Sequence, residues 1–531
     1  MKNNFIKQTA IYAAAIAVTV GAASCSKLDE KVFGSKSVVA TSGDAGSSAN
    51  LASVYEATNA LIGQGNFFAF QEHSTDELLG PTRGTDWDDF GTWRKIHLHA
   101  WDGAHNQLYD TWNGINSGLF KATLLVEKGA AADKPAAQFL RAFLATQVMD
   151  LFGQVPYRAA ADGPDVIPAV KTRAEAFDWI MTDLDGAIAG LPSTTGAAGA
   201  SRYATKQAAQ FLKARLLLNK AVYKADPKNP TGFTSADFAA TDMNAIITLV
   251  DAITASGKFS IGATAASYWN NFKWDNATTS TELIYTRGGE NAVQSGGNSG
   301  TNWATGMGTH YNQTFSGWNG FTTTSDFYNS FDAADGRRQS DIAGFTETTG
   351  FNAGFLAGQQ YKYVGGVKTK VNDRSGSPLI FTPDVSLFFS TEAKGIRTMK
   401  YPLKYDASLN NTQPNDFVFF RYADALLMKA EAIVRGGTAT NGETALVLVN
   451  KLRTRSGVAA LTATPTLSDI LAERGRELYL EAVRRDDLIR FGKFNDPVNE
   501  RSTKSEAFKV VLPIPNQAVS SNPNLKQNFG Y

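Results

Sequence analysis

The stretch Glu473-Arg474-Gly475-Arg476-Glu477-Leu478-Tyr479-Leu480-Glu481 interleaves acids and arginines. Its three glutamates recur every fourth residue, which predicts one shared face of a helix over 467–491. Two interpretations are open. Paired carboxylates are what a glycosidase uses as acid and as nucleophile or base. Glu481 and Arg485, at i, i+4 spacing, instead fit a structural ion-pair network, which we favour because glycosidase carboxylates usually come from separate elements.

Outward from this stretch, apolar residues at i, i+3 and i+4 spacing predict more helices. They fall at about 105–128, 135–151, 172–190, 203–224, 239–256, 417–435 and 441–456. Amphipathic helices in series predict a mainly α fold with a tetratricopeptide-like scaffold, although no strict repeat of about 34 residues is present. Residues 257–416 are rich in Gly, Ser, Thr and Asn and predict a large, loop-rich, irregular face for ligand. The prolines of Leu512-Pro513-Ile514-Pro515 predict an extended tail.

The N-terminus has the layout of a secretory signal. A basic start is followed by the apolar run 11–20 and the small residues 21–24, directly before Cys25, the only cysteine. This predicts a lipoprotein signal peptide over 1–24 and a lipidated Cys25 that opens a flexible tether over 25–50. The predicted body then divides into a helical region at 51–256, the loop-rich region at 257–416 and a C-terminal region at 417–531. A chain with one cysteine has no disulfide framework.

Net charge and hydropathy argue against two classes of protein: nucleic-acid-binding proteins and proteins with membrane-spanning helices. A net charge of +1 gives no indication of nucleic-acid binding. No later segment is apolar for the ~20 residues that a spanning helix needs. We therefore expect membrane attachment through the acyl chains alone, since two or more chains anchor stably.

Aromatic residues gather in two irregular regions. Trp87 and Trp93 lie in the first, and Trp303, Tyr311 and Trp318 lie in the second. Sugars bind to aromatic platforms flanked by polar side chains, and Arg83, Asp86 and Asn319 stand beside these rings in sequence. The alternative is that the tryptophans fix loops onto the core.

His97, His99 and His105 are the remaining candidates for chemistry. A His-x-His pair can chelate a metal, but no cysteine or His-Glu-x-x-His motif accompanies it. We favour hydrogen-bonding or packing roles and expect neither metal nor cofactor. No phosphate loop, dinucleotide fingerprint or nucleophile elbow is present.

Several blocks carry a family resemblance. Arg421-Tyr422-Ala423-Asp424-Ala425-Leu426-Leu427-Met428-Lys429-Ala430-Glu431-Ala432 resembles the signature helix of the SusD/RagB family of outer-membrane nutrient-binding lipoproteins. The block 473–481 with 484–494 resembles the most specific part of that family. In the N-terminal half, 150–157 is similar to its Gly-Asp-Val-Pro segment, with Gln154 in place of Asp. The matches span nearly the whole mature chain in order.

The resemblance implies a non-enzymatic lipoprotein at the outer membrane, facing the cell exterior. It would capture an oligosaccharide and pass it to a SusC-like TonB-dependent porin. The resemblance implies that a set of residues in the C-terminal helices are structural signature residues of the family: Arg421, Tyr422, Glu431, Glu473, Arg474, Glu477, Asp487 and Arg490. It does not assign the ligand contacts, so our hypothesis for them is Arg83, Asp86, Trp87, Trp303, Tyr311, Trp318 and Asn319. The alternatives are a secreted glycoside hydrolase using Glu473 and Glu477, and a binder of peptide or other non-sugar cargo.

Overall fold

A computed structural model describes residues 50–288, 302–404 and 414–531. The predicted signal peptide, Cys25 and all of the tether except Asn50 lie outside the described residues. Asn50 is the N-cap of the first described helix, where its side chain accepts a hydrogen bond from the Ser53 N–H at 2.8 Å.

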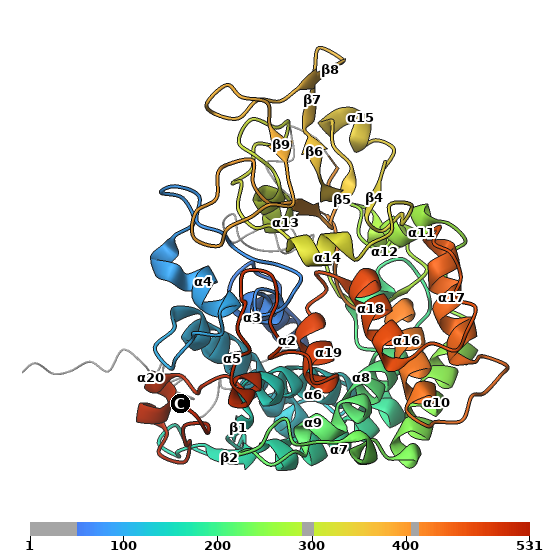
Figure 1. Cartoon of the computed structure of the whole chain (residues 1–531). Helices are drawn as coiled ribbons and strands as arrows, with labels where there is room; N and C mark the ends of the chain where they lie inside the picture. Colours follow the sequence, from blue (N-terminus) through green and yellow to red (C-terminus); the bar gives the residue numbers. More distant parts are fainter. Residues whose placement is uncertain (1–49, 289–301, 405–413) are drawn as a thin grey trace, which may run out of the picture. The chain divides into compact units, whose positions relative to one another are not determined.

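The fold is mostly helical, and its helices pack largely in chain order (Figure 1). The N-terminal helices are α2 (Leu51–Ala57), α3 (Asn66–Glu72), α4 (Thr92–His97), α5 (Asn106–Lys128), α6 (Lys134–Phe152), α7 (Arg173–Gly190), α8 (Lys206–Leu218), α9 (Lys220–Tyr223) and α10 (Ala240–Ala255). The C-terminal helices are α16 (Tyr422–Val434), α17 (Ala445–Arg455), α18 (Leu467–Leu478), α19 (Arg484–Arg490) and α20 (Asn516–Ser521). Each of α5, α6, α7 and α8 packs on the next long helix, and α10 packs on α16. The predicted tetratricopeptide-like scaffold is confirmed.

Local sequence explains where several of these helices begin and end. Capping boxes start α7 and α18, with Thr172 paired to Glu175 and Thr466 paired to Asp469. Helix α6 ends at Gly153, whose φ of 69° is a left-handed conformation that glycine adopts without strain.

Three predicted helices need correction. The segment 417–435 begins as strand β11 (Phe417–Arg421), because its run of Phe and Val pairs with β3 (Leu283–Arg287) before α16 starts. The segment 203–224 is broken at Asn219, whose side chain binds the Arg215 carbonyl at 2.9 Å and accepts from Arg490. The segment 467–491 is broken after Leu478, so Glu481 does not share a helix face with Glu473 and Glu477.

The loop-rich part has only short elements. Its helices are α11 (Ala265–Trp269), α12 (Asn276–Thr279), α13 (Asn302–Gly308), α14 (Ser325–Asn329) and α15 (Thr346–Thr349). Its strands after β3 are β4 (Gln339–Ser340), β5 (Ala353–Leu356), β6 (Gly358–Gln359), β7 (Tyr361–Val364), β8 (Val367–Lys370), β9 (Ile380–Phe381) and β10 (Arg397–Met399). They form the antiparallel sheets β10-β5-β4, β6-β9 and β7-β8. In Figure 1, helices α14 and α15 and strands β4 to β9, drawn in yellow and orange, gather beyond the long helices.

Helices and loops share one large hydrophobic cluster. The remaining sheet, β1 (Gln154–Tyr157) with β2 (Ala169–Thr172), links α6 to α7. Among the described residues, no helix combines the length and apolar character that crossing a membrane requires. The region boundaries at 256 and 416 stay a prediction.

Candidate functional site

Two loops that are more than two hundred residues apart in sequence lie side by side. The buried guanidinium of Arg83 donates hydrogen bonds to the carbonyls of Gly320, at 3.3 Å, and of Thr391 and Lys394, at 2.6 and 2.8 Å. Arg83 therefore ties the loop around residue 85 to the segments at 320 and 391–394. Its donors are occupied by main-chain oxygens rather than turned to a ligand.

Trp87 is half-buried at the junction of these loops. Its indole N–H donates to the carbonyl of Trp318 at 3.0 Å. Its ring lies against Gly320, where a Cβ atom would come within 2.5 Å of the indole. The ring also packs against Phe321, at a centroid distance of 5.1 Å. A glycine at position 320 is thus what permits the ring to lie there.

Trp318 is also half-buried, and its ring lies against Gly306, where a Cβ atom would come within 3.3 Å of the indole. Its neighbour Asn319 is fully buried and has a left-handed φ of 52°. The Asn319 side chain accepts from Arg397 at 2.7 Å and donates to the carbonyl of Glu392 at 3.2 Å. Asn319 therefore holds the loop in place beneath Trp318.

Charged and hydrogen-bonding groups on the same loops as the two indoles, and on the neighbouring 372–394 segment, bond to one another. The Tyr311 hydroxyl donates to Asp86 Oδ2 at 3.1 Å, and Arg374 Nη2 donates to the same oxygen at 3.1 Å. The Arg374 guanidinium lies 4.3 Å from the Tyr311 ring centroid and also pairs with Glu392. His310 Nε2 is 3.0 Å from Glu392 Oε2. We call the set of Asp86, Trp87, Tyr311, Trp318, Arg374 and Glu392 the aromatic face.

Protonation in this face follows from burial and pairing. Burial opposes the charge on Glu392, but hydrogen bonds from Arg374 and His310 outweigh it and lower the pKa of Glu392. Burial lowers the pKa of His310, which favours its neutral form. Burial and the Asp86 hydrogen bond raise the pKa of Tyr311, so its hydroxyl keeps its proton. Near neutral pH the face therefore offers the ionised Glu392, the Arg374 guanidinium and a phenol.

Trp303 lies elsewhere. It is 3% exposed, its indole N–H donates to the Ile62 carbonyl at 2.7 Å, and its ring packs against Phe68. It lines a small, mostly apolar pocket with Phe68, Leu78, Ala304, Met307, Thr398, Lys400, Tyr401 and Leu480. The pocket has room for about one water molecule. Trp303 is a core residue in this structure.

Sequence reasoning missed Arg374 and Glu392, because single charged residues in loops carry no pattern. It also missed three exposed rings. Phe90 is 95% exposed, Phe389 is 84% exposed, and Phe388, 46% exposed, lies 5.6 Å below the Arg94 guanidinium. Asp89 and Phe90 both have positive φ, a signal that appears only in the structure.

The three glutamates of the C-terminal block are buried ion-pair residues. Arg337 Nη1 binds Glu473 at 2.6 Å and Glu477 at 2.9 Å. Arg421 binds Glu477 and Glu481, each at 2.7 Å. Glu481 pairs with Lys400 and Arg421, and the predicted Glu481–Arg485 pair is wrong. The cause is the break in the helix after Leu478, because Arg485 then forms its ion pair with Asp150 on α6 instead.

These pairs also fix the protonation of the glutamates. Burial alone would raise the pKa of Glu473, but the charges of Arg337 and Arg476 outweigh it and lower the pKa to about 2. Arg455, Arg421 and Arg337 likewise overcome burial and lower the pKa of Glu477 far below its usual range. A glycosidase acid needs a raised pKa. Glu473 and Glu477 are therefore unsuited to that role.

The other signature residues extend this network. Arg474 binds Asp424 and Asp487, and Arg490 binds Glu431 and Asp487, at 2.7 to 2.8 Å. The Tyr422 hydroxyl is 2.9 Å from that of Thr254 on α10. The signature thus joins α16, α18 and α19 to one another and to the N-terminal helices.

Each predicted histidine has hydrogen-bonding partners of its own. His97 contacts the carbonyls of His73 and Asn499, at 3.1 and 2.9 Å. His99 contacts Ser505 and the Ser74 carbonyl, both at 2.8 Å, and His105 contacts the Thr92 carbonyl. Within the described ranges, no three His, Cys, Asp or Glu side chains group as a metal site would require.

Comparison with known proteins shows which family the C-terminal part of this chain resembles. The model of the SusD family matches residues 388–531, the part that carries the buried ion-pair network. The C-terminal part of the chain thus carries the sequence pattern of the SusD family. It is 30% identical over 222 residues to the starch-binding protein SusD of Bacteroides thetaiotaomicron, a match that covers 39% of this chain. The same match spans 35%, about a third, of that relative's length.

Solved SusD-like structures share the fold. A SusD superfamily protein of Parabacteroides distasonis superposes with a TM-score of 0.67 at 17% identity, over 91% of this chain and 98% of that one. Surface glycan-binding protein A of B. thetaiotaomicron, solved with laminarihexaose, superposes with a TM-score of 0.63 at 18% identity, over 90% of this chain and 98% of that one.

Proposed function

We propose that this chain is a non-enzymatic binding protein of the SusD family that captures an oligosaccharide on its aromatic face. The observation that carries the proposal is the convergence of Trp87, Trp318 and Tyr311 with the charged rim of Asp86, Arg374 and Glu392. Two similar proteins support it, since the sequence relative is a starch-binding protein and one structural neighbour was solved with laminarihexaose.

The chemistry of the face suits a sugar. Half-buried rings offer flat apolar surfaces to the C–H faces of pyranose rings. The rim supplies donors and acceptors for hydroxyl groups, and because its charges are already paired, it is held in position before ligand arrives. Buried anchors such as Arg83 and Asn319 keep the loops rigid.

We also propose where the protein acts. Cys25 carries the lipid that attaches it to the outer membrane, facing the cell exterior, and the tether lets it reach a SusC-like TonB-dependent porin. The bound oligosaccharide passes to that porin for import. These statements rest on the sequence around Cys25 and on the family, because the residues concerned lie outside the described part of the chain.

Calorimetry against a panel of oligosaccharides tests the binding proposal. We expect Trp87→Ala and Trp318→Ala to weaken binding by about tenfold or more, as central aromatic contacts do. The matched control is Trp179→Ala, because Trp179 is also half-buried but lies on α7, stacked with Arg141 and Lys171. Equal affinity in all four proteins would contradict the proposal, provided each shows the wild-type circular dichroism.

The same measurements separate the alternatives. A peptide that binds when no glycan does would show that the cargo is not a sugar. Release of product from a polysaccharide, lost in Glu477→Gln, would show a hydrolase. We expect no product release, because Glu477 is buried against three arginines.

A further inference from the structure

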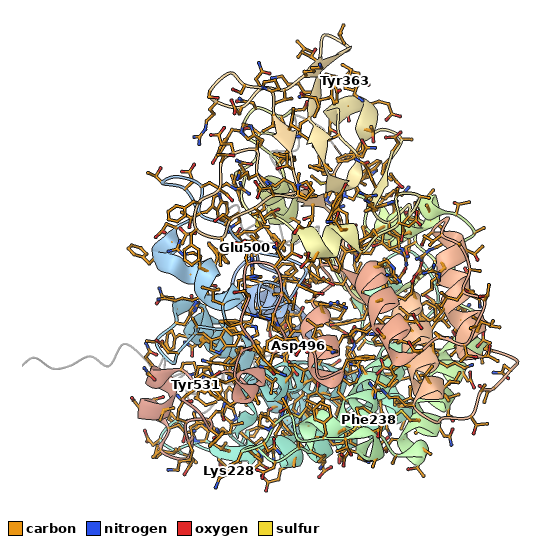
Figure 2. All side chains as sticks on the ribbon, viewed as in Figure 1. Lys228, Phe238, Tyr363, Asp496, Glu500 and Tyr531 are labelled. Atoms are coloured by element: carbon orange, nitrogen blue, oxygen red, sulfur yellow. The ribbon has the colours of Figure 1, made fainter. Side chains whose placement is uncertain are left out.

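The β7–β8 hairpin stands apart from the other sheets. Its strands pair only with each other among the described strands, in the register Tyr361 to Lys370, Tyr363 to Lys368 and Val364 to Val367. Figure 2 shows the labelled Tyr363 at the end of the loop-rich part that is farthest from the long helices. All of β8 and the turn before it are exposed.

One face of this hairpin alternates aromatic and cationic side chains. Directly opposed residues of an antiparallel pair lie on the same face, and side chains alternate along each strand. Tyr361, Tyr363, Lys368 and Lys370 therefore share a face. The Lys368 ammonium lies 4.8 Å from the Tyr361 ring centroid, which confirms that the two side chains meet.

The positive charge of the hairpin is not neutralised. Residues 361–371 contain three lysines and no Asp or Glu. In the part of the chain that the structure describes, Lys362, Lys368 and Lys370 form no ion pair. The whole chain carries a net charge of only +1, so this is a local concentration of free cations.

The hairpin adjoins the aromatic face. Lys362 Nζ donates to the carbonyl of Asn312 at 3.2 Å, and Asn312 Nδ2 donates to the carbonyl of Asn372 at 2.9 Å. Asn312 directly follows Tyr311. On the aromatic face the one guanidinium, Arg374, is already paired with Asp86 and Glu392, whereas the lysines of the hairpin have no carboxylate partner among the described residues.

We propose that the hairpin face of Tyr361, Tyr363, Lys368 and Lys370 binds an acidic polysaccharide, a sugar chain that carries carboxylate or sulfate groups. This inference rests on the proposed function and names the substrate class. Two tyrosines two positions apart on a strand are separated by about 6.6 Å. A sugar chain that runs along β7 meets both rings, while its anionic groups reach the lysines of β8.

The test compares one polymer in two charge states: polygalacturonate, and the same polymer after its carboxyl groups are reduced. Binding is measured with wild type, with Lys368→Gln/Lys370→Gln, and with the control Lys228→Gln/Lys258→Gln. Lys228 and Lys258 are also exposed, and Lys228 is labelled at the opposite end of Figure 2 from Tyr363. Glutamine keeps part of the apolar stem of lysine and removes the charge.

We expect wild type and the control to prefer polygalacturonate over its reduced form. The hairpin variant should bind polygalacturonate about five- to tenfold more weakly, as two exposed charge contacts would give, and with a weaker salt dependence. Its affinity for the reduced polymer should not change.

Three results would overturn this inference and leave the proposed function standing. Wild type could show no preference for polygalacturonate over its reduced form. The hairpin variant could bind polygalacturonate as tightly as wild type does, or it could lose the same affinity for both polymers. Binding of anionic vesicles or of nucleic acid through these lysines, with no binding of polygalacturonate, would overturn it too. Failure of the proposed function is distinct, because then wild type binds no glycan, neutral or acidic.

Discussion

At the scale of single residues, the turn at 479–483 explains how the glutamates reach their partners. Leu480 and Ala482 both adopt a positive φ of 57°. Their N–H groups donate to Glu77 Oε2 at 3.0 Å and to Glu72 Oε1 at 2.7 Å. The turn points Glu481 toward Lys400 and Arg421 rather than along α18.

This turn gives a residue-scale prediction. A left-handed conformation costs a non-glycine residue about 1 kcal/mol or more. Ala482→Gly should therefore raise the free energy of unfolding, by up to about 1 kcal/mol. Urea denaturation measures it, and Ala252→Gly, inside α10, is the control that should lose about 1 kcal/mol. A destabilised Ala482→Gly protein would show that the positive φ is wrong.

The same residues show what sequence could not predict. Four-residue spacing identified Glu473 and Glu477 as helix neighbours. It failed at Glu481, because carboxylates about four hundred positions away accept hydrogen bonds from the N–H groups of the turn and stabilise it. The aromatic content of the two irregular regions made Trp87 and Trp318 candidates, but nothing in the sequence showed that they meet. Arg83 and Asn319 gave no sign in sequence that main-chain and side-chain groups would occupy their polar atoms.

At the scale of elements, two buried carboxyls join α3 to the connection between α18 and α19. Glu72 ends α3 and Glu77 follows it, and one oxygen of each, Oε2 of Glu72 and Oε1 of Glu77, has no hydrogen-bond donor. Burial raises the pKa of Glu72 to about 7, and burial together with the charge of Glu72 raises that of Glu77. Asp76, Arg484, Lys400 and Glu481 are the charged groups that face the pair. We infer that the pair shares a proton.

A pH dependence of stability follows. A raised pKa means that the folded protein holds the proton more tightly than the unfolded chain does. The resulting stability is fully present below the ordinary glutamate value of 4.5 and is lost as the pH rises through about 7. Urea midpoints between pH 5 and 7.5 should fall more steeply for wild type than for Glu77→Gln. Burial lowers the pKa of Lys400 to about 8, so the range stops where its titration begins. Parallel profiles would contradict the shared proton.

Element by element, periodicity located the long helices α5, α6, α7 and α10 to within about two residues. It failed where tertiary contacts decide the structure. Strand β11 exists because β3 offers it a partner, and Asn219 breaks a helix because it meets Arg490. The short strands of the loop-rich part pair across long insertions, which no local pattern reveals.

At the scale of the whole molecule, binding and attachment are separable. The aromatic face lies on the described body, whereas Cys25 does not. We expect a Cys25→Ala protein to be released from the membrane fraction, to bind its oligosaccharide as wild type does and to fail in uptake. Cell fractionation with an uptake assay measures this. Uptake at the wild-type rate would show that the anchor does not couple binding to import.

The most direct test of the account is hydrogen–deuterium exchange of the purified protein with and without a saturating oligosaccharide. The aromatic face is built from the loops at 83–94, 309–320 and 372–394, whose amides the ligand should cover or hold closed. We predict that ligand slows exchange in these three loops and leaves α7 and α10 unchanged. Slowed exchange confined to the long helices, with the three loops unaltered, would contradict the account.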